Sequence, residues 1–385
     1  MKKNICVFTG GRQEYGILRP LLNEFRYSKK INLKIIAAGM HLSNEFGLTY
    51  KEINRDGFKI HEKIESILSS DTPVSISKSM GILMSSLSES LQRLKPDYLV
   101  LLGDRYETFA AASCAFVAKI PIIHIQGGEK TVGAFDDGFR HSITKMSTIH
   151  FVYHDEYKKR VIQLGENPKK VINYGGLNID SIKKTSLINK KELYDFFGIN
   201  KYKKLILVTF HPITLEKDNS KKYMINLFNF LKKFNKTHIV IFTKTNADTQ
   251  GRIINNLIDQ YTKKYSNVLS FKSLGQIKYL STLKYCEFVI GNSSSGVIET
   301  PHFKKSTINI GTRQQGRIKP INIVDSNYDT KSLFLAYKKI SSSKFKNKIK
   351  YMKNPFYKPD TAKKICLYLE KLNKKSSTIK FFNDL

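Results

Sequence analysis

The feature that most constrains the fold is a regular alternation between short apolar runs of strand length and longer segments with helical periodicity. In the first part of the chain the apolar runs are residues 4–8, 33–38, 98–102, 120–125 and 149–153. The helical segments are residues 15–25, 79–94, 108–118 and 154–164. Apolar strands that alternate with helices predict a parallel sheet covered on both faces.

The same alternation starts again near residue 205. Strands are predicted at 205–209, 238–243, 287–290 and 307–310, and helices at 223–232 and 276–283. Since a domain takes roughly 150 residues, the 385 residues predict two doubly wound, Rossmann-like α/β domains. We place them at residues 1–178 and 179–385, with the last helix packed back on the first domain. We expect the hinge at 175–198, which contains the polar stretch 181–191.

Polar side chains recur at one position in these units, directly after a predicted strand. Ligands of open α/β sheets bind at the carboxyl ends of the strands. In two domains that face each other these ends line one cleft, so we expect a ligand site there. The residues that follow predicted strands are Arg12, His41, Asp104, Glu129, His211, Ser293 and Arg313.

The densest group of charged residues follows the strand at 120–125. Here Glu129, Asp136, Asp137 and Arg140 lie within one short stretch. Neighbouring carboxylates and cations can set pKa values apart, which proton transfer requires. The alternative is a solvated loop in which Asp136 and Asp137 only favour the N-terminus of a helix.

Two further strand ends carry groups suited to acid–base chemistry. Asp104 stands beside Arg105, and we expect this arginine to keep the carboxyl ionised; the alternative is a structural ion pair. His211 precedes Pro212, which restricts its backbone toward an extended conformation, and an imidazole at a strand end suits proton transfer. The alternative for His211 is a buried histidine with its hydrogen bonds satisfied.

The segment 291–299 reads Gly-Asn-Ser-Ser-Ser-Gly-Val-Ile-Glu and predicts a strand end, a turn and a helix start. Backbone N–H groups and hydroxyls in such a turn bind phosphate, and Glu299 is placed to accept two ribose hydroxyls. Arg313 follows the next strand, and Arg12 follows the first; arginine suits bidentate contact with pyrophosphate. The alternatives are a serine N-cap with glutamate in the first turn, an ordinary strand–helix turn and a surface loop.

The net charge of +33 raises the question of a nucleic-acid partner. The lysines are spread along the chain, and the sequence has no RRM, KH or zinc-finger motif and no long basic tail. We therefore predict no specific nucleic-acid binding. The charge suits the steering of an anionic substrate.

The apolar runs and the cysteines indicate the cellular compartment in which the protein is expected. No apolar run reaches about 18 residues, and the run after the N-terminal lysines is too short for a signal peptide. We therefore expect a cytoplasmic protein with no membrane partner. The four cysteines match no metal-binding spacing, and three of them lie in apolar runs, which predicts buried free thiols.

In combination these motifs resemble the hydrolysing UDP-N-acetylglucosamine 2-epimerases of bacterial sialic-acid and legionaminic-acid synthesis. The resemblance covers nearly the whole chain and implies the GT-B architecture, in which two Rossmann-like domains face each other across a cleft. It also implies a UDP-sugar partner, no NAD or metal, and a homodimer or homotetramer. The segments that carry it are residues 11–16, 39–41, 103–105, 127–129, 136–145, 211–212, 291–296 and 311–313.

The reaction that the resemblance implies is an elimination followed by a hydration. UDP-GlcNAc would give ManNAc and UDP through a 2-acetamidoglucal, or the UDP-linked 2,4-diacetamido-2,4,6-trideoxyglucose would give its 2-epimer and UDP. The family's catalytic groups fall on Asp104, Asp136, His41 and His211, with Glu129 and Arg140 beside them. Its nucleotide contacts fall on Arg12, Arg105, Ser293, Ser294, Glu299 and Arg313.

One position departs from the family pattern. Many members carry a glutamate directly before the Gly-Gly pair, where this chain has Gln126. An amide cannot transfer a proton. Either Glu129 takes part of that role, or that carboxylate is dispensable in this branch.

Two other functions stay open from the sequence. A GT-B glycosyltransferase would use the same nucleotide end with a separate acceptor, and a nucleotide-sugar-binding regulator would have no turnover. Asp104 and Asp136 argue against the regulator, because binding UDP alone does not require them. The residues do not fix the substituents at C4 and C6 of the sugar.

Overall fold

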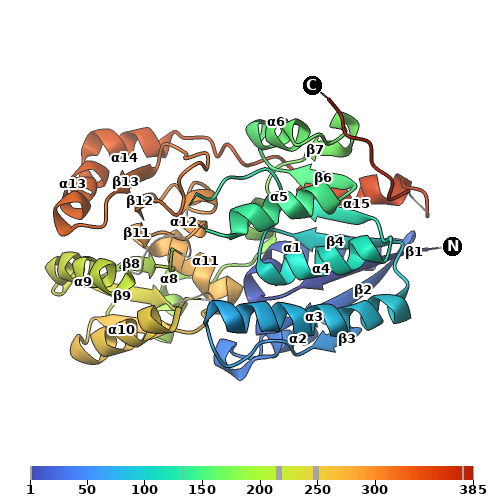
Figure 1. Cartoon of the computed structure of the whole chain (residues 1–385). Coiled ribbons are helices and arrows are strands. Elements are labelled where there is room, and N and C mark those ends of the chain that lie inside the picture. Colours follow the sequence, from blue (N-terminus) through green and yellow to red (C-terminus); the bar gives the residue numbers. More distant parts are fainter. Residues whose placement is uncertain (1, 133, 214–218, 246–250, 375–376, 385) are drawn as a thin grey trace. The chain divides into compact units, whose positions relative to one another are not determined.

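The computed structural model describes residues 2–132, 134–213, 219–245, 251–374 and 377–384. The chain forms two compact units, which we describe separately (Figure 1). Unit 1 comprises Met1–Glu129, Phe135–Lys184 and Phe356–Leu385, and unit 2 comprises Lys130–Ala134 and Thr185–Pro355. The C-terminal segment therefore belongs to the same unit as the first strand.

Unit 1 is built on seven parallel strands in the order β3-β2-β1-β4-β5-β6-β7. The order reverses between β1 and β4, because the chain first builds outward from β1 to β3 and then returns to the other side of β1. Such a reversal is where an open parallel sheet binds its ligand. The strands are β1 (Lys3–Thr9), β2 (Ile31–Ala38), β3 (Glu62–Ile64), β4 (Tyr98–Leu102), β5 (Ile122–Ile125), β6 (Ile149–Val152) and β7 (Val171–Asn173).

Helices cover both faces of this sheet (Figure 1). They are α1 (Arg12–Tyr27), α2 (Tyr50–Arg55), α3 (Pro73–Leu94), α4 (Tyr106–Val117), α5 (Asp136–Met146), α6 (Asp155–Gln163), α7 (Leu177–Lys184) and α15 (Thr361–Lys371). On β1, Ile5 and Val7 join a core cluster with α1 and α15. Cys6 and Phe8 join a second cluster with α3 and α4. Successive residues of a strand point to opposite faces, so one strand anchors both layers.

Unit 2 repeats this plan with six parallel strands in the order β10-β9-β8-β11-β12-β13. Its order reverses between β8 and β11. The strands are β8 (Lys204–Thr209), β9 (His238–Thr243), β10 (Val268–Phe271), β11 (Phe288–Gly291), β12 (Ser306–Ile310) and β13 (Ile323–Ser326). The helices are α8 (Lys190–Phe197), α9 (Ser220–Leu231), α10 (Gly251–Lys264), α11 (Gly275–Tyr285), α12 (Ser295–Ile298), α13 (Thr330–Ser341) and α14 (Ser343–Lys350).

The predicted class, two doubly wound parallel α/β domains, is confirmed in both units. The sequence pattern missed β3, β7, β10 and β13, which are the outermost strands of the two sheets. Each has three or four residues, and an edge strand buries too few side chains to give a continuous apolar run. In the polar stretch 181–191, α7 covers residues 181–184 and α8 covers residues 190–191. A capping box of Asn189 and Glu192 begins α8.

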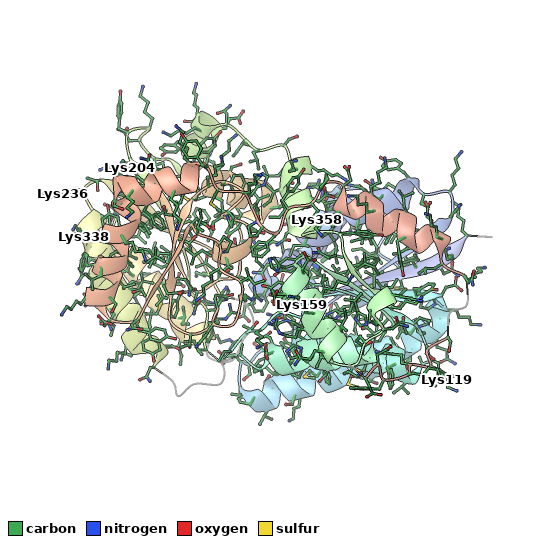
Figure 2. The ribbon with its side chains drawn as sticks, turned by 90° about the horizontal axis from the view of Figure 1, so that it is seen from above. Lys119, Lys159, Lys204, Lys236, Lys338 and Lys358 are labelled. Atoms are coloured by element: carbon green, nitrogen blue, oxygen red, sulfur yellow. The ribbon has the colours of Figure 1, made fainter. Side chains whose placement is uncertain are left out.

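The positive charge is distributed over many elements. Lys119 follows α4, Lys159 lies on α6 and Lys338 lies on α13, and the side chains labelled in Figure 2 come from separate helices, loops and a strand. All four cysteines are buried free thiols, as the sequence indicates for three of them. Among the helices of the described ranges, none has both the length and the apolar content to cross a membrane.

Candidate functional site

The first group of predicted site residues lies at the carboxyl ends of the strands of unit 1. Arg12 is the first residue of α1, after the Gly10-Gly11 turn that ends β1. Asp104 follows β4 by way of Gly103, whose φ of 79° is left-handed and favours glycine. Since β1 and β4 flank the reversal of strand order, these turns occupy the position where doubly wound sheets bind ligands.

The centre of this group is the guanidinium of Arg140, on the second turn of α5. Its Nη2 donates to Oδ2 of Asp104, and its Nη1 donates to Oδ1 of Asp137 at 3.0 Å. The same Nη1 donates to the backbone oxygen of Glu129 at 3.1 Å. The Arg140 side chain is 1% exposed, so one buried cation neutralises two carboxylates and joins three segments. Charge-assisted contacts of this kind are strong and fix geometry.

The ion pair of Asp104 is with a different arginine from its neighbour in sequence. The cation bonded to Asp104 is Arg140, whereas Nε of Arg105 lies 3.1 Å from Oε2 of Glu107. Arg105 is the N-cap residue of α4, so its chain continues into the helix and its side chain meets the fully buried Glu107. Asp136 begins α5, directly before Asp137, and is half-buried.

The Gly-Gly turn after β5 is tightly packed. Gln126 is buried and has a φ of 68°, and its amide Nε2 donates to Oδ1 of Asn178 at 3.4 Å. A Cβ at Gly128 would lie 2.4 Å from the backbone oxygen of Tyr157, so this position admits only glycine. Such a turn fixes where the next residue, Glu129, points.

Glu129 is buried, and its Oε1 accepts a hydrogen bond of 2.5 Å from the Tyr153 hydroxyl. Its backbone oxygen also belongs to the Arg140 group. Gln126 and Glu129 therefore lie on one turn with different surroundings: the amide faces another amide, and the carboxylate faces a phenol.

His41 follows β2 and is fully buried. Its Nε2 lies 3.0 Å from the Thr9 hydroxyl and its Nδ1 lies 2.8 Å from the Thr49 hydroxyl. Burial lowers the pKa of His41 to about 4, although hydrogen bonds to the backbone of Thr49 and Gly11 act in the other direction. The imidazole is therefore neutral near pH 7, and both ring nitrogens face hydroxyl groups.

The second group lies in unit 2, at the reversal between β8 and β11. The N–H of His211 donates to Oδ1 of Asn292 at 2.7 Å, and Nδ2 of Asn292 donates to the backbone oxygen of His211 at 2.8 Å. His211 is 4% exposed and Asn292 is fully buried. One side-chain amide thus clamps the backbone of the histidine across the switch point.

The backbone oxygen of Asn292 collects two further donors. Nη1 of Arg313 lies 3.1 Å from it, and Nε2 of Gln314 lies 2.8 Å from it. Arg313 and Gln314 follow β12, so Asn292 joins three strand ends of unit 2. In the sequence, Asn292 stands out only as one residue of the segment 291–299. Its position directly after a strand was the available signal.

The serine-rich turn after β11 carries a chain of hydroxyls. The Tyr279 hydroxyl donates to Oγ of Ser295 at 2.6 Å, and Oγ of Ser295 donates to Oε2 of Glu299 at 2.5 Å. Burial raises the pKa of Glu299, and the hydrogen bond from Ser295 partly offsets this. Ser294 is the N-cap of α12 but makes no side-chain capping bond, so the capping alternative for Glu299 is not what the structure shows. Oγ of Ser293 lies 3.4 Å from the N–H of Ser295.

The structure therefore brings some of the predicted residues of each unit into one bonded group. In unit 1, Arg140 gathers Asp104, Asp137 and the backbone of Glu129, while His41 and Arg105 have separate partners. In unit 2, Asn292 joins His211 to Arg313. Within the ranges described by the structure, no set of three His, Cys, Asp or Glu side chains is arranged to hold a metal ion.

The chain is similar to one family model and to several known proteins. Residues 23–370 match the family model for UDP-N-acetylglucosamine 2-epimerase. The chain is 45% identical to the GDP/UDP-N,N'-diacetylbacillosamine 2-epimerase (hydrolyzing) of Campylobacter jejuni, covering 90% of this chain and 89% of that protein. It is 38% identical to the polysialic acid biosynthesis protein P7 of Escherichia coli, covering 92% and 90%.

The fold has solved counterparts. A crystal structure of UDP-GlcNAc 2-epimerase from Neisseria meningitidis bound to UDP-GlcNAc matches with a TM-score of 0.81 at 21% identity, covering 96% of this chain and 100% of that chain. The UDP-GlcNAc 2-epimerase of Methanocaldococcus jannaschii in complex with UDP-GlcNAc and UDP matches with a TM-score of 0.77 at 18% identity, covering 96% and 99%. At these identities the likeness concerns the fold.

Proposed function

Because the chain belongs to the UDP-N-acetylglucosamine 2-epimerase family, we propose that it releases UDP from a UDP-linked 2-acetamido sugar and inverts C2. The protein is a hydrolysing UDP-sugar 2-epimerase of the type used in nonulosonic-acid synthesis. UDP-N,N'-diacetylbacillosamine is the substrate we favour. The relative at 32% identity is named for it, and the relative at 45% identity is named for GDP/UDP-N,N'-diacetylbacillosamine. UDP-GlcNAc is the second candidate, supported by a relative of that name at 30% identity.

The chemistry consists of two proton transfers with no net oxidation or reduction. In the first step a base takes the C2 proton, the C1–O bond to UDP breaks, and a C1–C2 double bond forms. In the second step water adds its oxygen to C1, and C2 regains a proton on the opposite face. The products are UDP and the 2-epimeric free sugar.

The observation that carries this proposal within the structure is the Asp104–Arg140 pair at the switch point of unit 1. A buried guanidinium holds the carboxylate in one orientation, and proton transfer from a weakly acidic C–H needs a base in fixed geometry. We assign proton transfer to Asp104 and Asp136, with Glu129 and His211 as the further acid–base groups. The neutral His41 serves as a hydrogen-bonding group.

We assign the nucleotide to the second set of predicted residues. The leaving diphosphate needs donors where negative charge develops, which arginine guanidinium groups and serine hydroxyls provide. Glu299 carries an oxygen acceptor suited to a ribose diol. The proposed contacts are Arg12, Arg105, Ser293, Ser294, Glu299 and Arg313.

The experiment that tests the function is turnover of each UDP-sugar in D₂O without any acceptor, followed by NMR. We expect free UDP and the 2-epimer with deuterium at C2, because the lost proton is replaced from solvent. A glycosyltransferase would need an acceptor to release UDP at a comparable rate. Release of UDP with no deuterium at C2 would contradict the elimination–hydration route.

A second prediction concerns the nucleotide end. Glu299→Gln and Arg313→Met should each weaken UDP binding by about 1–3 kcal/mol, the range for hydrogen bonds to charged groups. Isothermal titration with UDP measures this. Glu192→Gln is the matched control, because Glu192 lies in the first turn of α8 and caps that helix. Unchanged UDP affinity in both site variants would remove these residues from the nucleotide site.

A further inference from the structure

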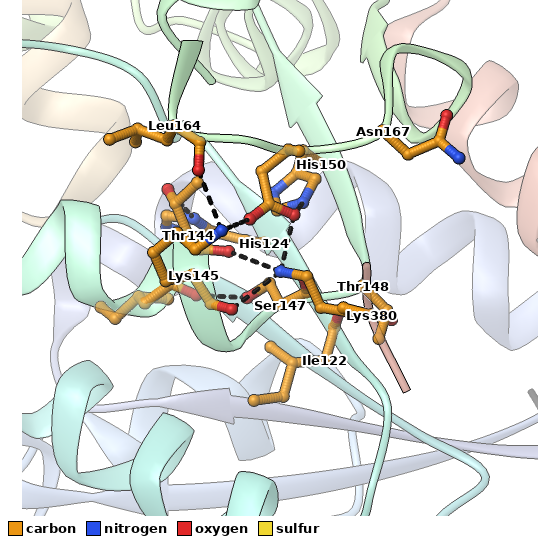
Figure 3. Close-up of polar contacts among 12 residues, drawn as sticks. Ile122, His124, Thr144, Lys145, Ser147, Thr148, His150, Leu164, Asn167 and Lys380 are labelled. Carbon is orange, nitrogen blue, oxygen red and sulfur yellow. Dashed lines mark hydrogen bonds and ion pairs between the residues drawn. The ribbon is translucent and has the colours of Figure 1, made fainter. Parts of the chain in front are cut away.

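In the C-terminal segment of unit 1, Lys380 contacts α5, the helix that carries Arg140, the partner of Asp104. Nζ of Lys380 donates to the backbone oxygens of Lys145 at 2.7 Å and Ser147 at 2.6 Å, and lies 3.4 Å from that of Thr144 (Figure 3). These are the last carbonyl groups of α5 and its C-cap. Carbonyls at the C-terminus of a helix have few partners within the helix, although that of Thr144 also accepts from the N–H of Ser147. A cation at this end is stabilising.

A buried carboxylate fixes the lysine in this position. Oε2 of Glu166 lies 2.6 Å from Nζ of Lys380 and 3.0 Å from Nε2 of His150, and Oε1 lies 3.0 Å from Nζ of Lys145. Glu166 is 2% exposed. Burial acts to raise the pKa of Glu166, but the hydrogen bonds and charges of His150 and Lys380 outweigh it and hold that pKa below its ordinary value. The ion pair is therefore anchored inside the unit.

The segment around Lys380 is seated by its neighbours as well. The N–H of Asn383 donates to the backbone oxygen of Gly165 at 3.0 Å. A Cβ at Gly165 would lie 2.3 Å from the Phe382 ring, and Nζ of Lys145 lies 4.9 Å from the centre of that ring. Glycine at 165 therefore leaves the space that the phenylalanine occupies.

The same end of α5 is tied to the turn that carries Asp104. Nδ1 of His124 lies 3.2 Å from the Thr144 hydroxyl (Figure 3). Its Nε2 lies 2.8 Å from the backbone oxygen of Gly103. His124 is fully buried. At its other end, α5 reaches Asp104 through Arg140. The helix α5 is thus fixed to the Gly103-Asp104 turn at two points. Arg140 binds Asp104 near the N-terminal end of the helix, and Lys380 binds the C-terminal end.

We propose that Lys380 is a positioning residue for the reaction, which caps α5 and thereby holds Arg140 in register with Asp104. It acts through the helix and does not touch the substrate. This inference rests on the proposed function, in which Asp104 takes part in proton transfer.

The test is a kinetic comparison in the full chain. Lys380→Met, which keeps most of the side-chain length and removes the charge, should lower kcat by about 10-fold to 100-fold while KM and the Kd of UDP change less than about 3-fold. Lys380→Arg should recover most of the rate, because it restores a cation with donors for the carbonyls. Lys363→Met, an exposed lysine on α15, is the matched control and should behave as wild type.

A double-mutant cycle separates positioning from general weakening of the fold. Once Arg140→Lys has loosened the contact with Asp104, adding Lys380→Met should cost less than about 3-fold further in kcat. Leu369→Ala removes a buried side chain of α15 and lowers Tm without touching α5, so it should keep its kcat at temperatures below its Tm. If the methionine variant does not fold, Lys380→Gln, which keeps an amide donor, replaces it.

Three outcomes would overturn the inference. They are a wild-type kcat in Lys380→Met, additive effects in the cycle, and an equal loss of kcat in Leu369→Ala. Absence of a 2-epimer from the wild-type protein would instead remove the proposed function. The two failures are therefore distinguishable in one set of assays.

Discussion

Asp104→Asn is expected to lower kcat by about 10²–10⁴-fold, the usual cost of removing a positioned acid or base, while the Kd of UDP stays near that of wild type. Asparagine has the shape of aspartate and keeps one oxygen that can accept from Arg140, so the fold of unit 1 should persist. The group that is lost is the one that exchanges a proton. Steady-state kinetics and a UDP titration on the same preparation measure both quantities.

Comparison with Glu129→Gln decides what replaces the family glutamate at position 126. If Glu129 transfers a proton, its variant should lose a similar factor in kcat, and Gln126→Ala should lose less. If the only role of the Glu129 carboxylate is to accept the hydrogen bond from the Tyr153 hydroxyl, Glu129→Gln should keep most of the activity. Asp195→Asn, an exposed carboxylate on α8, should be unchanged. Wild-type kcat in Asp104→Asn would contradict the assignment of this residue.

The strand ends could be predicted from sequence because two local signals coincide there. An apolar run marks a buried strand, and a following glycine marks the left-handed turn, as at Gly103 and Gly128. The chain order of these runs also indicates a parallel sheet. For this reason Arg12, Asp104 and His211 were correctly placed directly after central strands.

The partners of those residues could not be predicted in the same way. Arg105 is the neighbour of Asp104 in sequence, but the side chain that bonds Asp104 is Arg140, brought near by the packing of α5 against α4 and β5. Asn292 is hydrogen-bonded to the backbone of His211. Because every residue has a backbone N–H or C=O group, the residue types in the sequence do not reveal such a contact. Lys380 is one of many lysines, and only the tertiary structure distinguishes it.

Arg140→Met should be the most destabilising single change among the site residues. Its side chain is 1% exposed and bonds Asp104, Asp137 and the backbone oxygen of Glu129. Methionine removes the charge and leaves both carboxylates without this cation. Removing one partner of a fully buried ion pair costs about 3–5 kcal/mol. The side chains of Asp104 and Asp137 are 22% and 33% exposed, so water partly solvates them and we expect a loss toward the lower end of that range. Since the chain has no tryptophan, urea unfolding followed by far-ultraviolet circular dichroism is the suitable measurement.

A second substitution shows whether the uncompensated carboxylate is the cause. Adding Asp104→Asn to Arg140→Met removes one of the two carboxylate charges that the loss of Arg140 leaves unpaired with it. The double variant should therefore be more stable than Arg140→Met alone by at least about 1 kcal/mol, which lies within the range of coupling energies for residues in contact. Arg140→Lys should lie between wild type and Arg140→Met, because an ammonium keeps the charge but lacks the planar fork that reaches two carboxylates together. Equal stability of Arg140→Met and wild type would mean that water solvates the pair. The role of Arg140 would then be limited to orienting Asp104, and the kinetic effect of its substitution would have to persist without any change in the free energy of unfolding.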